Sequence, residues 1–530
     1  MSPDAPRRPR SWVVLVLLGF AVAVAACSGD EPSSSPSTTT IADPGDDRSG
    51  ADDGADDAPS ESDEAAGDRD PSDPEPADDP ALSARCPEYL PEIEMACGQL
   101  DVPVNYDEPS DATYSLPYVV LPALGDDPSD EPLVFMQGGP GFSTLEIVPF
   151  FVEHPEFRVD RDVIFLEQRG TDPSGLFLRC DPGLATIDDV RACRERYVSQ
   201  GVDLSSFTTL NAARDLASLR AELGIDRWHL LGGSYGTTLA MVAMDNDPEG
   251  VASVILDAPT APDVIIYTAD VESLLNAFTK VFDDCGADPD CGPRNPDLFE
   301  NHVANVERLF AQPWDISGTD LATVFGPTID FRVYIELTAT LLSGDPGALP
   351  AFVTANAQRD ADALFELVVG VDGADDDSPS VEDGEEAPQE FAQALNFSIY
   401  CAEEAPYFDP ETSRIETVDA WPAGTEEIYL PAFAEICSVW DVEAADPADV
   451  DQVRSDIPTL ILAGEYDHTT PIRQGEIAAA GLTDVELIEV PSTGHTTLDN
   501  ACARSIMVDF LRAPGGDRSC LDDIAPIVWR

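Results

Sequence analysis

Short apolar runs alternate with helical segments from Cys97 onward, and this alternation restricts the possible fold more than any other feature of the chain. Several runs consist almost entirely of Val, Ile, Leu and Phe, which suits strands covered on both faces by helices. Strand, helix and strand in repeated order indicate an α/β fold with a mostly parallel sheet. The expected strands are Pro117–Leu121, Pro132–Met136, Arg161–Leu166, His229–Leu231, Ala252–Leu256, Thr459–Ala463 and Val485–Val490.

One long interruption divides this pattern. Residues 261–454 read as mainly helical, and strands resume only after them. A helical insertion followed by a return to strands predicts a cap over the sheet. We therefore expect an α/β core in two parts, 86–260 and 455–530, with the helical cap inserted between them.

The N-terminus has the pattern of an export signal. Three arginines within the first ten residues precede residues 12–26, an apolar run about as long as a signal-peptide h-region. The run leads into VAAC at 24–27, which looks like a bacterial lipobox in which Cys27 receives a lipid. The alternative is an ordinary signal peptide with a chance cysteine. We expect 1–27 to direct export, with the protein lipid-anchored on the outer face of the bacterial cell membrane or secreted.

Two stretches lack the composition of a folded core. Residues 28–85 consist almost entirely of Ser, Thr, Pro, Gly, Ala, Asp and Glu. Such a segment cannot bury enough apolar surface to offset the entropy lost on ordering, so it is expected to be a disordered acidic tether. A second acidic stretch, 371–390, is expected to form a mobile loop within the folded region.

The charge of the chain excludes one class of partner. The 530 residues contain 28 Lys and Arg against 102 Asp and Glu, which gives a formal net charge of -74. Nucleic-acid binding requires a basic face that neutralises phosphates, so we expect no nucleic-acid partner. Acidity on this scale favours solubility rather than marking a particular site.

The cysteine count supports lipidation and predicts disulfides. Eleven cysteines are present, and setting Cys27 aside leaves ten. An even number at short separations in an exported chain favours disulfides, and the CxxC and HxxxH spacings of metal sites are absent. We expect no metal and no cofactor, and five sequence-local pairs: Cys86 with Cys97, Cys180 with Cys193, Cys285 with Cys291, Cys401 with Cys437, and Cys502 with Cys520.

The sequence GGSYG at 232–236 lies directly between a strand-like run, 228–231, and a helix-like run, 237–241. In the pattern G-x-S-x-G, a serine sits on a strained turn from strand to helix, and flanking glycines avoid clashes. The N-terminus of the following helix directs its positive dipole at a developing oxyanion. We predict that Ser234 is a nucleophile and that the amide of Tyr235 belongs to an oxyanion hole.

A second glycine-rich loop, QGGPG at 137–141, follows the expected strand 132–136. Backbone at this position can approach a substrate carbonyl and supply the second amide of an oxyanion hole. An ordinary tight turn is the alternative. The order of strand, GGPG loop, strand, helix, strand and GGSYG turn favours an oxyanion amide from Gly138 or Gly139.

A nucleophilic serine needs a base and an acid, which follow it in the order acid, then histidine, in folds with this turn. Of five histidines, one precedes Ser234, one lies on its strand, one lies in the cap and one adjoins the best acid candidate. His495, just after the expected strand 485–490, remains as the base. Asp467, just after 459–463, is the expected acid. Each alone could be a loop residue, but their order and positions predict a triad.

Together these motifs resemble a known family. The GGPG loop, EQRG at 167–170, GGSYG, GEYD at 464–467 and GH at 494–495 are similar to the proline-iminopeptidase-like group of α/β-hydrolases. Within that group the chain looks most like the secreted tripeptidyl-aminopeptidase-like serine peptidases of actinobacteria, from about residue 86 to the C-terminus. That family often has His before GGPG and Asp before QRG, where this chain has Gln137 and Glu167.

The resemblance implies an α/β-hydrolase that acts on peptide or protein substrates, releasing short peptides from free N-termini through an acyl-enzyme on Ser234. It also implies cap-side carboxylates that bind the substrate's amine, for which Glu403 and Glu404 are the candidates. With so many carboxylates in the chain, solvated surface residues are the alternative. Two other functions stay open: a carboxylesterase or lipase with the same triad, and a non-catalytic surface binding protein on this scaffold.

Overall fold

A single eight-stranded sheet forms the centre of the molecule in a computed structural model, which describes Cys86 and residues 93–107, 112–172, 175–180, 184, 186–372, 391–408 and 433–530. The strand order is β1-β2-β4-β3-β5-β6-β9-β10. The strands are β1 (Ala96–Pro103), β2 (Thr113–Leu121), β3 (Leu133–Met136), β4 (Val163–Leu166), β5 (Trp228–Gly233), β6 (Val251–Asp257), β9 (Thr459–Gly464) and β10 (Val485–Val490), and a separate hairpin pairs β7 (Trp314–Asp315) with β8 (Thr328–Ile329).

The sheet is parallel from β4 to β10, and only β1 and β2 run antiparallel to their neighbours. Each of the seven expected strands corresponds to a strand of the large sheet, and β1 is the strand of that sheet that the apolar runs did not reveal. Its buried and exposed residues alternate, because β1 is an edge strand with one face in solvent. The α/β-hydrolase fold expected from the sequence is confirmed.

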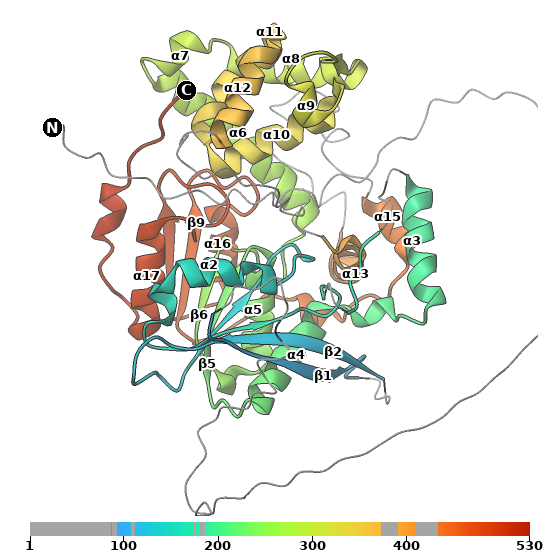
Figure 1. Ribbon diagram of the computed structural model, residues 1–530, viewed down its shortest axis with the longest axis vertical. Coiled ribbons are helices and arrows are strands. Elements are labelled where there is room, and N and C mark those ends of the chain that lie inside the picture. The colour runs from blue at the N-terminus through green and yellow to red at the C-terminus, as the bar shows by residue number, and fades with distance from the viewer. Residues whose placement is uncertain are drawn as a thin grey trace, which may run out of the picture.

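Helices cover both faces of the sheet, which explains why its central strands are mostly apolar (Figure 1). On β3, Val134 packs in the core that includes α4 (Thr209–Glu222) and α5 (Tyr235–Asn246), whereas Phe135 packs in the core that includes α2 (Val148–Glu153) and α17 (Ala501–Arg512). The helices of these layers and their flanks are α2 (Val148–Glu153), α3 (Ile187–Ser199), α4 (Thr209–Glu222), α5 (Tyr235–Asn246), α13 (Gln393–Glu403), α15 (Phe433–Trp440), α16 (Ile472–Ala479) and α17 (Ala501–Arg512).

A second helical layer lies over the carboxyl edge of the sheet and has its own apolar core (Figure 1). The last residues of the chain pack with it, and the amide of Arg530 donates to the carbonyl of Gly347. The helices of this layer are α6 (Ile266–Ala287), α7 (Cys291–Arg294), α8 (Leu298–Ala311), α9 (Ala322–Phe325), α10 (Phe331–Gly344), α11 (Leu349–Gln358) and α12 (Ala361–Asp372).

The described residues of the insertion expected at 261–454 are mainly helical, and their helices form two groups rather than one cap. Helices α13 and α15 lie beside α3 at the flank of the sheet (Figure 1). Phe397 and Trp440 pack in the core of the α/β domain, not in that of the helical layer. The difference arises because both helices bury their apolar faces against the core, which a helical periodicity alone cannot reveal.

Five disulfides join the same cysteine couples that the sequence predicts: Cys86–Cys97, Cys180–Cys193, Cys285–Cys291, Cys401–Cys437 and Cys502–Cys520. Three of them tie a helix to an adjacent segment of the α/β domain or its flank, and Cys285–Cys291 lies in the helical layer. The expected lipidation site Cys27, the tether at 28–85 and most of the acidic stretch 371–390 lie outside the described residues.

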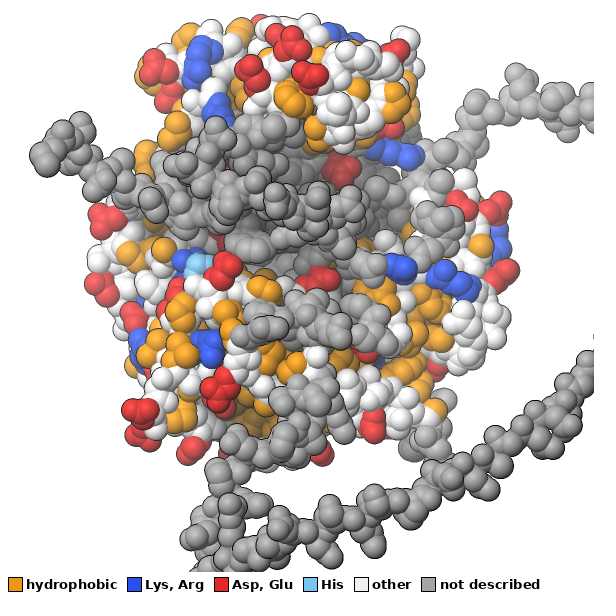
Figure 2. All heavy atoms as spheres, in the orientation of Figure 1, with side chains coloured by type: hydrophobic (Ala, Val, Ile, Leu, Met, Phe, Trp, Pro, Cys, Tyr) orange, Lys and Arg blue, Asp and Glu red, His pale blue; other side chains and the backbone are white. Residues whose placement is uncertain are grey.

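Acidic side chains are spread over the visible face of the described surface, with fewer basic ones among them (Figure 2). This distribution matches the formal net charge of -74. No helix in the described part of the chain is long and apolar enough to cross a membrane.

Candidate active site

Ser234 lies on the sharp turn between β5 and α5, with backbone angles of φ 54° and ψ −127°. Other parts of the backbone come so close to this turn that glycine is required on both sides of Ser234. A Cβ atom at Gly232 would lie 2.1 Å from the Gly236 carbonyl oxygen, and one at Gly236 would lie 2.2 Å from that of Met136. The two glycines therefore let the serine occupy a strained conformation at the carboxyl end of the sheet.

The GGPG loop lies against this turn. A Cβ atom at Gly138 would be 2.9 Å from the Cβ of Ser234 and 3.4 Å from its Oγ, so the loop backbone directly borders the serine side chain. The amide of Gly138 donates to the Oε1 of Gln137 at 3.3 Å, a long hydrogen bond. The structure thus brings both predicted oxyanion segments to Ser234, with the amide of Tyr235 in the first turn of α5.

Asp467 and His495 form a hydrogen-bonded pair. The Nδ1 of His495 lies 3.0 Å from both carboxylate oxygens of Asp467. Asp467 also accepts hydrogen bonds from the amides of Thr469 and Thr470, at 2.9 and 2.8 Å, and from the Oγ1 of Thr470 at 3.0 Å. Burial by itself raises the pKa of this carboxyl, but His495 and the hydrogen bonds outweigh it and hold the pKa below its ordinary value. Asp467 is therefore a stable anion that can orient the imidazole.

The loops that carry this pair fit closely together. A Cβ atom at Gly464 would lie 2.1 Å from the Gly494 carbonyl oxygen, and the amide of Tyr466 donates to the carbonyl of Thr493 at 2.9 Å. Because β5, β6, β9 and β10 are consecutive parallel strands, their carboxyl ends share one edge of the sheet. Ser234, Asp467 and His495 all follow strands at that edge.

Asp257, at the end of β6, links the serine turn to the histidine loop, and the sequence interpretation missed it. Its backbone carbonyl accepts from the amide of Ser234 at 2.9 Å. Its carboxylate accepts from the amide and Oγ1 of Thr497 and from the amide of Leu498. Burial raises its pKa to about 6, and the bonds from Thr497 offset part of that rise. The sequence signal that could have identified Asp257 was an acidic residue at the end of a buried strand.

Glu167, one of the two departures from the family pattern, accepts hydrogen bonds from residues that follow the GGPG loop. It is fully buried and accepts from the Oγ of Ser143 at 2.7 Å and from the amides of Thr144 and Leu145 at 3.0 and 3.3 Å. These donors immediately follow the loop. Glu167 therefore helps to fix the position of the GGPG loop, although it does not lie next to Ser234.

The two carboxylates considered for a substrate amine already have protein partners. Both oxygens of Glu403 accept hydrogen bonds from Thr209, one from its amide and one from its Oγ1, each at 2.6 Å. Burial raises the pKa of Glu403 to about 7, and the Thr209 bonds offset part of that rise. The Oε2 of Glu404 accepts from the amide of Ile266 at 2.9 Å. A substrate amine would have to share these carboxylates, and their role in amine binding stays a prediction.

The helical layer touches the loops of the acid and the histidine. A Cβ atom at Gly494 would lie 2.3 Å from the Ser343 carbonyl oxygen at the end of α10. The Nζ of Lys280, from α6, lies 3.0 Å from Glu465. The layer is therefore placed to shape access to the site. Within the described residues, no cluster of three or more His, Cys, Asp or Glu is arranged to hold a metal ion.

Comparisons with known proteins agree with the α/β-hydrolase fold. A family model described as alpha/beta hydrolase fold matches residues 131–286, and one described as TAP-like protein matches 426–520. Serine protease Hip1 of Mycobacterium tuberculosis (strain ATCC 25618 / H37Rv) is 25% identical over 460 residues, which cover 76% of this chain and 82% of that protein.

Proline iminopeptidases match a shorter region. The probable proline iminopeptidase of Leptolyngbya boryana is 27% identical over 130 residues, covering 24% of this chain and 32% of that protein. The proline iminopeptidase of Lactobacillus delbrueckii subsp. bulgaricus is 30% identical over 160 residues, covering 30% and 45%. The chain thus has the α/β-hydrolase fold, and the proteins that it resembles include a serine protease and proline iminopeptidases.

Proposed function

We propose that this protein is an exported, lipid-anchored aminopeptidase that releases short peptides from free N-termini, with Ser234, Asp467 and His495 as its catalytic triad. The observation that carries the triad is the pairing of His495 with both oxygens of Asp467 at the sheet edge where Ser234 occupies its strained turn. The TAP-like match and the proline iminopeptidases among the relatives support aminopeptidase action.

In the proposed reaction, His495 removes the proton from the Oγ of Ser234 as this oxygen attacks the scissile carbonyl carbon. Asp467 holds the imidazole with its Nδ1–H toward the carboxylate and stabilises the imidazolium. The proton then passes to the leaving amine as the C–N bond breaks, which leaves an ester on Ser234. Water, activated by the same histidine, hydrolyses this ester and releases the N-terminal fragment.

The oxyanion of each tetrahedral intermediate would be held by the amide of Tyr235 and by one from Gly138 or Gly139. The hydrogen bond from Gly138 to Gln137 is long, so the oxyanion can replace Gln137 as the acceptor of that amide. Both donors belong to backbone segments that packing already fixes. Little reorganisation is then needed as charge develops on the substrate oxygen.

A substrate panel tests aminopeptidase action. Chromogenic tripeptide anilides with free and with acetylated N-termini would be compared with short-chain nitrophenyl esters. We expect turnover of the free-amine peptides and at least about tenfold lower kcat/KM when the amine is blocked, because acetylation removes the charged amine that such a site would bind. Equal turnover of both peptide forms would contradict an aminopeptidase, and turnover of esters alone would favour the carboxylesterase alternative.

Membrane anchoring is proposed from Cys27 and the export pattern before it. The full chain, expressed in an actinobacterial host, should fractionate with membranes, because a lipid chain adds apolar contact with the bilayer. A Cys27→Ala variant should lose this association while keeping its activity. Membrane association that is equal in both proteins would show that Cys27 is not the anchor.

A further inference from the structure

Helix α13 contacts the GGPG loop along most of its length, although more than two hundred and fifty residues separate them in the chain. The amide of Ala392, just before the helix, donates to the Gly141 carbonyl at 2.9 Å. The Nδ2 of Asn396 donates to the Pro140 carbonyl at 3.2 Å, and the Oη of Tyr400 donates to the Gly139 carbonyl at 3.2 Å. Three consecutive carbonyls of the loop are thus bound by one helical segment.

The loop needs such external support. Gly139 has a φ of 117°, a conformation open to glycine, and the loop contains three glycines with little conformational preference of their own. The aromatic ring of Phe391 also packs on the loop, since a Cβ atom at Gly141 would lie 2.9 Å from its Cε2. The direction of the Gly138 and Gly139 amides therefore depends on the contacts that hold the carbonyls after them.

The C-terminal end of α13 reaches the other side of the oxyanion hole. The carboxylate of Glu403 accepts from Thr209, and the Oγ1 of Thr209 shares a hydrogen bond of 2.8 Å with the Oη of Tyr235. Tyr235 follows Ser234 and would supply the second oxyanion amide. One helix is therefore connected to both backbone segments that border the serine.

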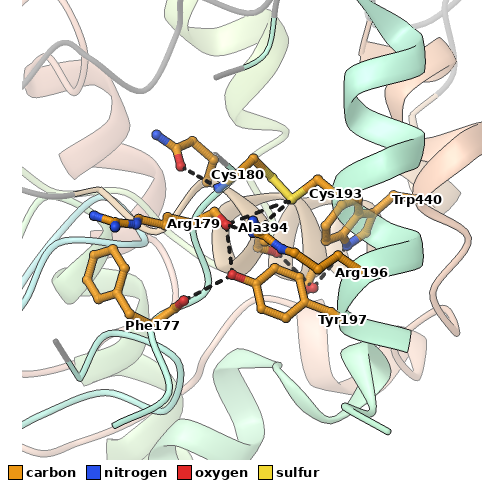
Figure 3. The surroundings of a disulfide bond; sticks show 10 residues. Phe177, Arg179, Cys180, Cys193, Arg196, Tyr197, Ala394 and Trp440 are labelled. Atoms are coloured by element: carbon orange, nitrogen blue, oxygen red, sulfur yellow. Dashed lines mark hydrogen bonds between the residues drawn. A yellow bond between two sulfur atoms is a disulfide. The ribbon is translucent and has the colours of Figure 1, made fainter. Parts of the chain in front are cut away.

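Two disulfides and a set of hydrogen bonds hold α13 in place. Cys401–Cys437 joins it to α15, and the Nε1 of Trp440 donates to the Oγ of Ser398 at 3.0 Å. On the other flank, the amide of Ala394 donates to the Leu178 carbonyl at 2.8 Å. Figure 3 shows the surroundings of this contact. The Cys180–Cys193 disulfide joins the segment that follows Leu178 to α3, next to Ala394 and Trp440.

We propose that Tyr400 and Asn396 are positioning residues of the reaction, which hold the GGPG loop so that its amides face the oxyanion. The proposal rests on the proposed function, in which that loop supplies an oxyanion amide. The contacts are specific to the loop: each residue donates from its side-chain end to one loop carbonyl, and both side chains are largely buried. Neither residue belongs to a catalytic motif of the sequence.

The test compares Tyr400→Phe with Tyr407→Phe as a matched control. Both substitutions remove one hydroxyl that donates to a backbone carbonyl, but Tyr407 donates to Ala445, outside the GGPG loop. We expect Tyr400→Phe to lower kcat about tenfold on nitrophenyl esters with KM changed less than about twofold, because an oxyanion hole acts mainly on the transition state. Tyr407→Phe should keep the wild-type kcat.

Asn396→Leu gives a second variant, which removes the hydrogen bond to Pro140 while keeping the approximate side-chain volume. Combined with Tyr400→Phe, it should lower kcat about a hundredfold, the loss expected from a displaced oxyanion donor. Melting temperature and the fraction of Ser234 labelled by a fluorophosphonate would be measured for every variant. Rates are then expressed per labelled site, so that unfolded protein does not count as lost catalysis.

The positioning role is overturned if kcat per labelled site is unchanged in Tyr400→Phe and in the double variant. If wild-type Ser234 is labelled normally in the same experiment, the proposed function still stands. An equal fall of kcat in Tyr400→Phe and Tyr407→Phe also overturns the positioning role, because the effect would then be general. Failure of wild-type Ser234 to react with the fluorophosphonate overturns the proposed function, and the positioning role with it. Because esters are the substrates, the result does not depend on peptide preference.

Discussion

Replacement of Ser234 by alanine should lower peptide and ester turnover at least about 10⁴-fold, to the level left by binding and the oxyanion hole alone. The side chain is the attacking nucleophile in the proposed reaction, and the backbone of the GGPG loop borders it directly. The measurement is kcat on a free-amine peptide anilide and on a nitrophenyl ester, with fluorophosphonate labelling as an independent readout.

The fold should tolerate this change. Alanine removes one oxygen at a position whose conformation is set by the glycines around it, so the melting temperature should stay within a few degrees of wild type. Ser199→Ala, an exposed position at the end of α3, is the matched control and should leave kcat unchanged. Turnover above about one per cent of wild type in the Ser234→Ala protein would remove Ser234 from the mechanism.

Replacement of Asp467 by asparagine should lower kcat about 10⁴-fold through the tautomer of His495. The amides of Thr469 and Thr470 both donate to Oδ1, so they will keep the oxygen of the asparagine at that position. The new amide nitrogen then takes the place of Oδ2 and donates to the Nδ1 of His495. This hydrogen bond favours the imidazole with its proton on Nε2, where it cannot accept the proton of the serine.

The control for this variant is Asp484→Asn, an exposed residue in the turn before β10. It makes the same change in charge and should keep the wild-type kcat and melting temperature. The Asp467→Asn protein should stay folded, because three of the hydrogen bonds to this residue come from its own loop and two of them keep an acceptor. Retention of more than about a tenth of wild-type kcat would mean that another group orients His495.

The central strands and the site motifs were predictable because their signals are local. A strand buried on both faces is mostly apolar, and β3, β5 and β9 are buried at every position. The serine turn is recognisable because the crossing of Gly236 with the Met136 carbonyl excludes any side chain. The order of strands along the chain then brings Asp467 and His495 to the same sheet edge as Ser234.

Other features depend on contacts between distant segments and leave no local pattern. Edge strand β1 has an alternating pattern that short windows read poorly. The hydrogen-bond partners of Glu403 and Asp257 were beyond prediction because Thr209 and Thr497 lie almost two hundred residues or more away along the chain. The surplus of acidic residues also gave no sign of which carboxylates are buried.

The division of the helical insertion into two groups limits how such enzymes can be recombined. A segment exchanged with a relative to change substrate preference would have to end before Phe391, because α13 belongs to the scaffold of the GGPG loop. The end of α10 in the exchanged segment would also have to reproduce the close approach of the Ser343 carbonyl to Gly494. The helical layer and the scaffold of the GGPG loop are therefore separate blocks of sequence, and an exchanged layer must also preserve the contact of Lys280 with Glu465.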